Sequence, residues 1–215
     1  MSYTHLIFDL DGTLIDTETA VLQTWQRTLA DYGYSFGLEE MRVVLGVTTD
    51  IGLARLGAKV DERYAARWQK NYESFAAQCD YFPGAKAMLL RLRQMGCHLG
   101  AVSSRSRREY DRCFAGFDFD QLMETVVLEE DTQKHKPDAE PLLKYMELAH
   151  ARAEDCLYVG DMPTDALCAR SAGVAAGLVR WNGSAVDTSA ADFVFSTPDD
   201  LLRLLTPDRA PECES

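Results

Sequence analysis

Short apolar runs recur along the chain and alternate with stretches of helical periodicity. Six runs have strand length and are apolar at consecutive positions, which is typical of parallel strands covered on both faces. They are residues 6–8, 99–102, 126–128, 157–159, 175–179 and, more weakly, 193–195. Between them, apolar side chains recur every three or four positions, as at Met88, Leu92 and Met95, and this stripe stops at Gly96. The alternation predicts an α/β fold with a Rossmann-like parallel sheet core.

One long segment interrupts this alternation. Residues 16–82 contain no convincing strand, whereas Val21, Trp25 and Leu29 fall at helical spacing. A second stripe of aromatic residues lies within 64–75. Such stripes are typical of helices that bury one face. We therefore expect a small all-helical unit inserted directly after the first strand.

This pattern divides the chain into two expected domains. Residues 1–15 and 83–206 would form a discontinuous α/β core, and residues 16–82 a separate helical unit. Thr49 is a candidate N-cap residue for a short helix inside the insertion. Residues 207–215 are polar and contain proline, so we expect a disordered tail.

Composition narrows the class of function. The chain has 215 residues, of which 47% are hydrophobic and 26% charged, as in ordinary globular proteins. The formal net charge is -12, and basic residues do not cluster, which disfavours a nucleic-acid partner. An acidic protein can still bind an anion where a local cation assists. A small anionic ligand is therefore an allowed partner.

The N-terminal residues and the cysteines indicate the cellular location of the protein. Residues 1–8 lack a basic region followed by a long apolar one, and no apolar run approaches the length of a membrane span. None of the six cysteines forms a C-x-x-C pair, and several lie in apolar stretches, so we expect reduced thiols. We predict a cytoplasmic protein without a membrane partner.

Polar side chains with matching chemistry follow four of the predicted strands. They are Asp9 and Asp11, Ser103 and Ser104, Lys136, and Asp161 and Asp165. Ligands of open α/β sheets bind at the carboxyl ends of the strands, so these residues are expected to share one crevice. Each motif alone is common in loops, but the ordered set is far more specific.

This set of residue types suits the hydrolysis of a phosphate ester. A hard cation such as Mg²⁺ prefers oxygen ligands, which carboxylates provide. One carboxylate can attack phosphorus, and a second can protonate the leaving group and later activate water. A hydroxyl, a lysine and the metal offset the charge of the transferring group.

With these motifs in this order, the chain resembles the haloacid dehalogenase superfamily, in particular its phosphoglycolate phosphatase-like subgroup. The resemblance covers roughly residues 4 to 205 and rests on four motifs, at 9–14, 102–103, 136–141 and 160–165. Ala139 stands where relatives often carry proline, which is a minor departure. The insertion at 16–82 lies where this family places the helical cap called C1.

The resemblance implies roles for the first acid pair. Asp9 would be the nucleophile, forming an aspartyl phosphate, and a ligand of Mg²⁺. Asp11 would be the general acid/base, protonated when substrate binds, and its backbone carbonyl would also bind the metal. True dehalogenases of the superfamily lack an equivalent of Asp11, so its presence favours phosphoryl transfer.

The other three motifs would complete the site. By resemblance, Ser103 and the backbone N–H of Ser104 hold phosphate oxygens, and Lys136 neutralises the phosphate and orients the nucleophile. Asp161 would bind Mg²⁺ directly, and Asp165 would support the metal site. The loops near residues 16 and 83 would act as hinges for the cap.

Substrate choice is expected to depend on the cap and on the loop after the second core strand. The candidates for substrate contact are Arg42, Gly46, Thr48 and Thr49 in the cap, and Ser104 and Arg105 beside the second motif. The cap carries nearly balanced charge, which favours a small substrate over a polyanion.

Rival functions remain open at this point. A phosphomutase resembling β-phosphoglucomutase would share the motifs, but such enzymes carry a histidine where this chain has Val21 and a basic loop where it has residues 46–49. A signalling receiver would lack the helical insertion, and a non-catalytic phosphate-binding module would not need every catalytic position. The sequence leaves the substrate open among phosphoglycolate, sugar phosphates, nucleotides and pyrophosphate, and it allows a monomer or a homodimer.

Overall fold

A computed structural model describes residues 3–183 and 185–206. Its main sheet has six parallel strands in the order β5-β4-β1-β6-β7-β8. The strands are β1 (His5–Phe8), β4 (His98–Val102), β5 (Thr125–Val127), β6 (Cys156–Gly160), β7 (Ala175–Val179) and β8 (Phe193–Phe195). All six predicted strands are therefore present, and the predicted α/β sheet is confirmed.

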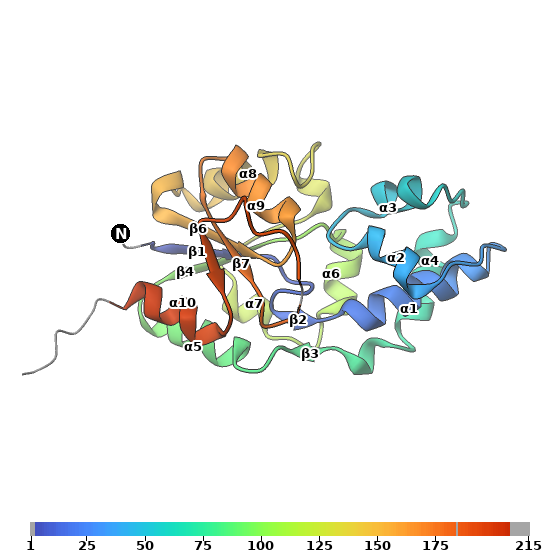
Figure 1. Cartoon of the computed structure of the whole chain (residues 1–215), viewed down its shortest axis with the longest axis horizontal. Helices are drawn as coiled ribbons and strands as arrows, with labels where there is room; N and C mark the ends of the chain where they lie inside the picture. Colours follow the sequence, from blue (N-terminus) through green and yellow to red (C-terminus); the bar gives the residue numbers. More distant parts are fainter. Residues whose placement is uncertain (1–2, 184, 207–215) are drawn as a thin grey trace, which may run out of the picture.

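Helices cover both faces of this sheet, which is why its strands are apolar at consecutive positions (Figure 1). Within β1, Leu6 and Phe8 enter the core cluster on one face, and Ile7 enters the cluster on the other. The helices outside the insertion are α5 (Ala85–Gln94), α6 (Arg107–Cys113), α7 (Phe119–Leu122), α8 (Glu140–Ala149), α9 (Pro163–Ser171) and α10 (Pro198–Leu205). Figure 1 shows α8 and α9 on one face of the sheet and α5 and α10 on the opposite face. Short 3-10 turns occupy Glu129–Asp131 and Ala153–Asp155.

The strand register brings the motifs to one edge. Phe8, at the end of β1, pairs with Ala101 of β4 on one side and with Val159 of β6 on the other. Asp9 follows Phe8 directly, while Ser103 and Asp161 each come two residues after the partner. Because all these strands are parallel, their carboxyl ends meet at the same edge. β1 lies near the middle of the sheet, so Asp9 is placed at the centre of the crevice.

The insertion is built from helices that lie beside this edge (Figure 1). They are α1 (Glu18–Ala30), α2 (Leu38–Met41), α3 (Thr49–Leu56) and α4 (Tyr64–Tyr72), with 3-10 turns at Arg42–Val44 and Ala76–Gln78. The buried face of α1 includes Val21, Trp25 and Leu29, as the spacing predicts. Trp25 packs against Tyr64 of α4 with ring centroids 5.6 Å apart.

Two local predictions for the insertion need correction. A two-stranded antiparallel ribbon, β2 (Ile15–Asp16) with β3 (Asp80–Tyr81), stands at its base, where no strand was expected. Two residues are too few for a hydrophobic period, so sequence patterning cannot detect such strands. Thr49 is the first residue of α3 rather than its cap, and Thr48 in the cap position makes no side-chain capping bond.

The cysteines, the C-terminal tail and the absence of a membrane span were also predicted from the sequence. Five cysteines, Cys79, Cys97, Cys113, Cys156 and Cys168, are free thiols in the described part of the chain. The expectations for Cys213 and for the tail at 207–215 fall outside the described residues. No described helix combines the length and apolar character needed to cross a membrane.

Candidate active site

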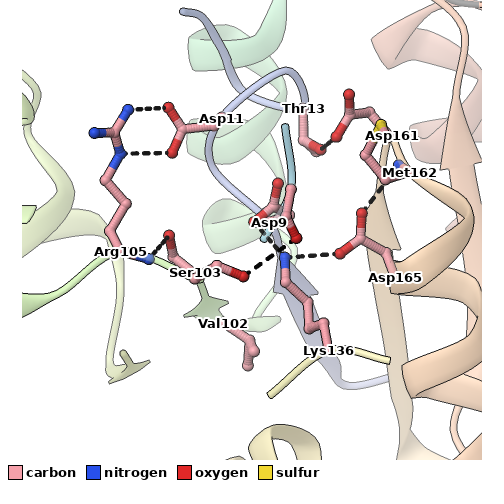
Figure 2. Close-up of polar contacts among 12 residues, drawn as sticks. Asp9, Asp11, Thr13, Val102, Ser103, Arg105, Lys136, Asp161, Met162 and Asp165 are labelled. Carbon is pink, nitrogen blue, oxygen red and sulfur yellow. Dashed lines mark hydrogen bonds and ion pairs between the residues drawn. The ribbon is translucent and has the colours of Figure 1, made fainter. Parts of the chain in front are cut away.

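The candidate nucleophile Asp9 is buried at the end of β1 and is held by a single lysine. Lys136 Nζ donates to Asp9 Oδ1 at 2.9 Å and to Asp165 Oδ1 at 2.8 Å, so one ammonium links the first and fourth motifs (Figure 2). Both Asp9 and Lys136 are 3% exposed. Burial alone would lower the pKa of Lys136, but the adjacent carboxylates of Asp165 and Asp9 raise it above its usual value. The lysine therefore stays charged.

Three buried carboxylates gather beside this lysine. Oxygen atoms of Asp9, Asp161 and Asp165 all lie within 4.8 Å of one another. Burial and the neighbouring Asp165 raise the pKa of Asp9 to about 7, although Lys136 opposes the shift. Burial, with Asp165 and Asp9, raises the pKa of Asp161 well above its usual value. Lys136 supplies only one positive charge, so this crowding of like charges is costly without a further cation. An all-oxygen donor set fits Mg²⁺.

Close packing positions the fourth motif. Gly160 ends β6, and a Cβ at this position would lie 2.4 Å from Cβ and Cγ of Asp165. Only glycine therefore lets the start of α9 approach the strand this closely. Tyr158 Oη lies 3.0 Å from Asp165 Oδ1 and 3.1 Å from the carbonyl oxygen of Val102, so its one hydroxyl proton is shared between these two acceptors. The Asp165 carboxylate is thereby fixed from two sides, by Tyr158 and by Lys136.

In the part of the chain that the structure describes, the side chain of Asp11 lies outside the cluster of three carboxylates. Its side chain turns to Arg105, whose Nε and Nη2 donate to the two carboxylate oxygens at 2.8 and 2.6 Å (Figure 2). Thr17 Oγ1 adds a third bond at 2.6 Å. The partial burial of Asp11 raises its pKa, but Arg105 and Thr17 outweigh this and hold it below the usual value. In this conformation Asp11 is ionised, whereas the sequence led us to expect a protonated acid in the substrate complex.

A cavity of about 80 Å³ opens between these residues and the helical insertion. Its lining includes Asp9, Asp11, Ser103, Ser104, Arg105, Lys136 and Asp161 from the strand ends, and Gly46 and Thr49 from the insertion. Ser104 Oγ donates to the carbonyl of Gly46 at 3.4 Å. A Cβ at Gly46 would lie 3.0 Å from Cγ of Met162, so the insertion loop packs against both the second and the fourth motif.

Two of the predicted substrate contacts do not reach this cavity. Arg42 is exposed and pairs with Glu18, with Nη1 at 2.5 Å from Oε1, and it is absent from the cavity lining. Thr48 is buried but is also absent from the lining. Sequence spacing placed both residues near the loop at Gly46 but could not indicate which way their side chains point.

The structure adds residues that the motifs did not include. Trp181 and Asn182 follow β7, at the same sheet edge as the motifs. Trp181 Nε1 donates to the carbonyl of Thr13 at 2.8 Å, and Asn182 Nδ2 donates to the carbonyl of Gly12 at 2.9 Å and to Asp161 Oδ2 at 3.2 Å. Thr13 Oγ1 donates to Asp161 Oδ1 at 3.4 Å. Ligand-binding residues tend to follow the carboxyl ends of parallel strands. Had the predicted strand at 175–179 been considered in the same way as the first four, this rule would have indicated Trp181 and Asn182.

Comparison with known proteins agrees with this geometry. Residues 6–179 match the family described as haloacid dehalogenase-like hydrolase. The chain belongs to this family. Its hydrolase class, which the motifs predicted, is thereby confirmed, and the names of its relatives agree with a phosphatase.

Curated relatives and solved structures give more detail. The chain is 34% identical over 194 residues to a protein of Caldanaerobacter subterraneus subsp. tengcongensis that carries the name pyrophosphatase PpaX, covering 85% of this chain and 84% of that protein. It is 29% identical to pyrophosphatase PpaX of Bacillus mycoides, covering 96% and 98%. A crystal structure from Lactobacillus plantarum that carries the name phosphoglycolate phosphatase superposes with a TM-score of 0.84 at 28% identity, covering 95% and 100%.

Proposed function

We propose that this haloacid dehalogenase-like hydrolase cleaves small phosphate monoesters, or pyrophosphate, through an aspartyl phosphate on Asp9, and that it uses Mg²⁺. The arrangement of Asp9, Lys136, Asp161 and Asp165 carries the proposal, since it combines a buried nucleophile with a cation and an oxygen-rich metal site. Asp9, Asp161 and Asp165 would hold the metal, together with the backbone carbonyl of Asp11. Bound Mg²⁺ would offset the charge of the phosphoryl group.

In the first step, an Asp9 carboxylate oxygen attacks phosphorus and the bond to the leaving oxygen breaks. Asp11, brought to the leaving group as the acid, gives that oxygen a proton. Lys136 offsets the repulsion between the carboxylate and the phosphate dianion. Ser103 and the backbone N–H of Ser104 would bind phosphate oxygens from the end of β4.

In the second step, water attacks the phosphorus of the aspartyl phosphate. Asp11 takes the proton of this water, the bond from Asp9 to phosphorus breaks, and inorganic phosphate leaves. Both carboxyl groups then return to their starting states. The enzyme therefore needs no further co-reactant.

Residues 16–82 would act as the cap, and residues 1–15 with 83–206 as the catalytic core. Gly46 and Thr49 line the cavity from the insertion, so its helices can exclude bulk water during the first step. The ribbon of β2 and β3 forms the base of the insertion, close to both expected hinges. Of the expected substrate contacts, Gly46, Thr49, Ser104 and Arg105 line the cavity.

Hydrolysis is preferred to a phosphomutase reaction. Val21 lies in the cavity wall, where an apolar side chain offers no proton donor or acceptor to a bound sugar. The loop at 46–49 carries no basic residue either. A structure named β-phosphoglucomutase from Thermotoga maritima superposes with a TM-score of 0.73 at 24% identity, a likeness that extends to the fold alone.

A phosphate-release screen tests the proposal. Purified protein with Mg²⁺ is expected to release inorganic phosphate from at least one small phosphate ester or from pyrophosphate, and addition of EDTA should stop the release. Asp9→Asn removes the nucleophile and serves as the control. Inactivity towards about a hundred phosphorylated metabolites, or full activity of Asp9→Asn, would contradict the proposal.

A further inference from the structure

The pairing of Asp11 with Arg105 has a consequence for substrate choice. The carboxylate of Asp11 accepts three bonds, two from the Arg105 guanidinium and one from Thr17. Both carboxylate oxygens are therefore engaged, and neither is free to serve a leaving group. If Asp11 acts as the acid of the proposed reaction, it must first leave Arg105.

Arg105 itself is held firmly in place. It is 7% exposed, and its guanidinium carbon lies 5.4 Å from the ring centroid of Trp68 and 5.6 Å from those of Tyr72 and Phe114. Its Nη1 also lies 3.5 Å from Cys113 Sγ. Aromatic faces stabilise a cation but do not replace an anionic partner. A guanidinium this deeply buried is strongly destabilised when its carboxylate moves away and nothing takes its place.

The position of Arg105 indicates what could replace Asp11. Arg105 lines the cavity beside Ser103, the proposed phosphate contact, and its backbone N–H donates to Ser103 Oγ at 3.2 Å. A substrate whose phosphoryl group lies between Asp9 and Ser103 would extend its leaving group towards the guanidinium. The planar fork of arginine binds carboxylate or phosphate oxygens through two parallel bonds.

We propose that Arg105 is the specificity-determining residue of this enzyme and selects phosphate substrates whose leaving group carries a second anionic group. That group, a carboxylate or a phosphoryl group, exchanges with Asp11 on the guanidinium and so releases Asp11 to the leaving oxygen. This inference rests on the proposed phosphatase function. A neutral leaving group supplies no exchange partner, so Asp11 stays with Arg105 and turnover is slow.

The acidic residues of the cavity wall do not contradict this choice. Glu18 is neutralised by Arg42. Glu109 accepts bonds from the backbone N–H and the hydroxyl of Ser106, as the partner in a capping box. Among the described residues that line the cavity, Arg105 and Lys136 are the only lysine or arginine side chains, and Lys136 is already shared between Asp9 and Asp165. Arg105 is therefore the cation that remains for the leaving group.

A pair of substrates of matched length tests the inference. Phosphoglycolate releases an alcohol with a carboxylate, and 2-hydroxyethyl phosphate releases one with a neutral hydroxyl. The wild-type enzyme should favour phosphoglycolate in kcat/KM by about tenfold or more, the size expected for a charge-assisted bond. Pyrophosphate should behave as an anionic substrate.

Substitutions separate selection from mere support of the fold. Arg105→Gln should lower the ratio of kcat/KM for phosphoglycolate to kcat/KM for 2-hydroxyethyl phosphate by about tenfold to a hundredfold relative to the wild type. Arg105→Lys keeps the charge without the fork and should restore part of the preference. Arg107→Gln removes an exposed arginine two residues away, outside the cavity lining, and should leave the ratio unchanged.

The outcomes distinguish the two proposals. If Arg105→Gln loses kcat/KM equally for phosphoglycolate and for 2-hydroxyethyl phosphate, Arg105 only supports the fold. An unchanged ratio of the two kcat/KM values therefore overturns the inference. If Arg105→Gln does not fold, the wild-type ratio decides, because equal turnover of the two substrates contradicts selection by Arg105. Absence of phosphate release from every ester and from pyrophosphate by the wild type would instead overturn the proposed function.

Discussion

Magnesium is expected to stabilise the folded protein strongly, because the candidate metal site is overcharged without it. When all three are ionised, Asp9, Asp161 and Asp165 contribute three negative charges, and Lys136 contributes one positive charge. Two carboxylates separated by 4.8 Å repel each other by about 3.5 kcal/mol at an effective dielectric constant of 20. A divalent cation brings the formal charge of this group to zero.

The size of the effect follows from binding linkage. At a Mg²⁺ concentration about 100 times its Kd, the folded state gains about 2.7 kcal/mol. For a chain of this length, 1 kcal/mol shifts Tm by about 2–4 °C, so an increase of about 5–10 °C is expected. Thermal unfolding followed by circular dichroism, with and without EDTA, measures it.

The effect should also depend on pH. The pKa of Asp9 is raised from 3.8 to about 7, so between these values the folded protein holds a proton that the unfolded chain has lost. The metal-free protein therefore loses stability as pH rises through this window. Mg²⁺ competes with that proton. The increase in Tm on adding Mg²⁺ should consequently be larger at pH 8 than at pH 6.

Asp161→Asn isolates the metal site. The amide resembles the protonated acid, so at pH 6 the metal-free Tm should stay within about 3 °C of the wild type, while the response to Mg²⁺ disappears. Asp199→Asn, which removes an exposed carboxylate on α10, should keep the full response. This account of the cluster would be refuted if the wild-type Tm did not change on addition of Mg²⁺. It would also be refuted if the Tm of Asp161→Asn still increased.

Three further substitutions test individual contacts, and a fourth, Gly33→Ala, serves as a control for one of them. Lys136→Met leaves Asp9 without its ammonium partner and should lower kcat by about a hundredfold or more in a phosphate-release assay; retention of wild-type kcat would contradict the role of the lysine. Gly12→Ala places a Cβ 2.4 Å from Asp161 Oδ2 at a φ of 75°, so it should weaken both stability and Mg²⁺ binding. Gly33→Ala, with a φ of 84° and open space around it, should affect stability alone, and equal Mg²⁺ affinities for the two variants would count against the proposed clash. Asn182→Ala removes a bond to Asp161 and should raise the Mg²⁺ concentration for half-maximal activity by about tenfold, with kcat at saturating Mg²⁺ near that of the wild type; an unchanged Mg²⁺ requirement would exclude Asn182 from the metal site.

Much of the fold could be predicted from local sequence. Consecutive apolar positions at 6–8 and 157–159 indicate strands buried on both faces, and the structure confirms them as β1 and β6. Helical spacing of Trp25 and its neighbours predicts α1, because a buried helical face repeats every three to four residues. These features depend on the period of the backbone, which any short segment reveals by itself. The two-residue strands β2 and β3 carry no such period, and they were missed.

The residues expected at the active site were determined by sequence in type and order, since the carboxyl ends of parallel strands meet at one edge. Only the tertiary structure decided which side chains meet there. It pairs Asp11 with Arg105, 94 positions away, and it turns Arg42 outward to Glu18. It also adds Asn182 beside Asp161. The physical reason is that side-chain direction and partner choice depend on packing between distant segments, and no local period records that packing.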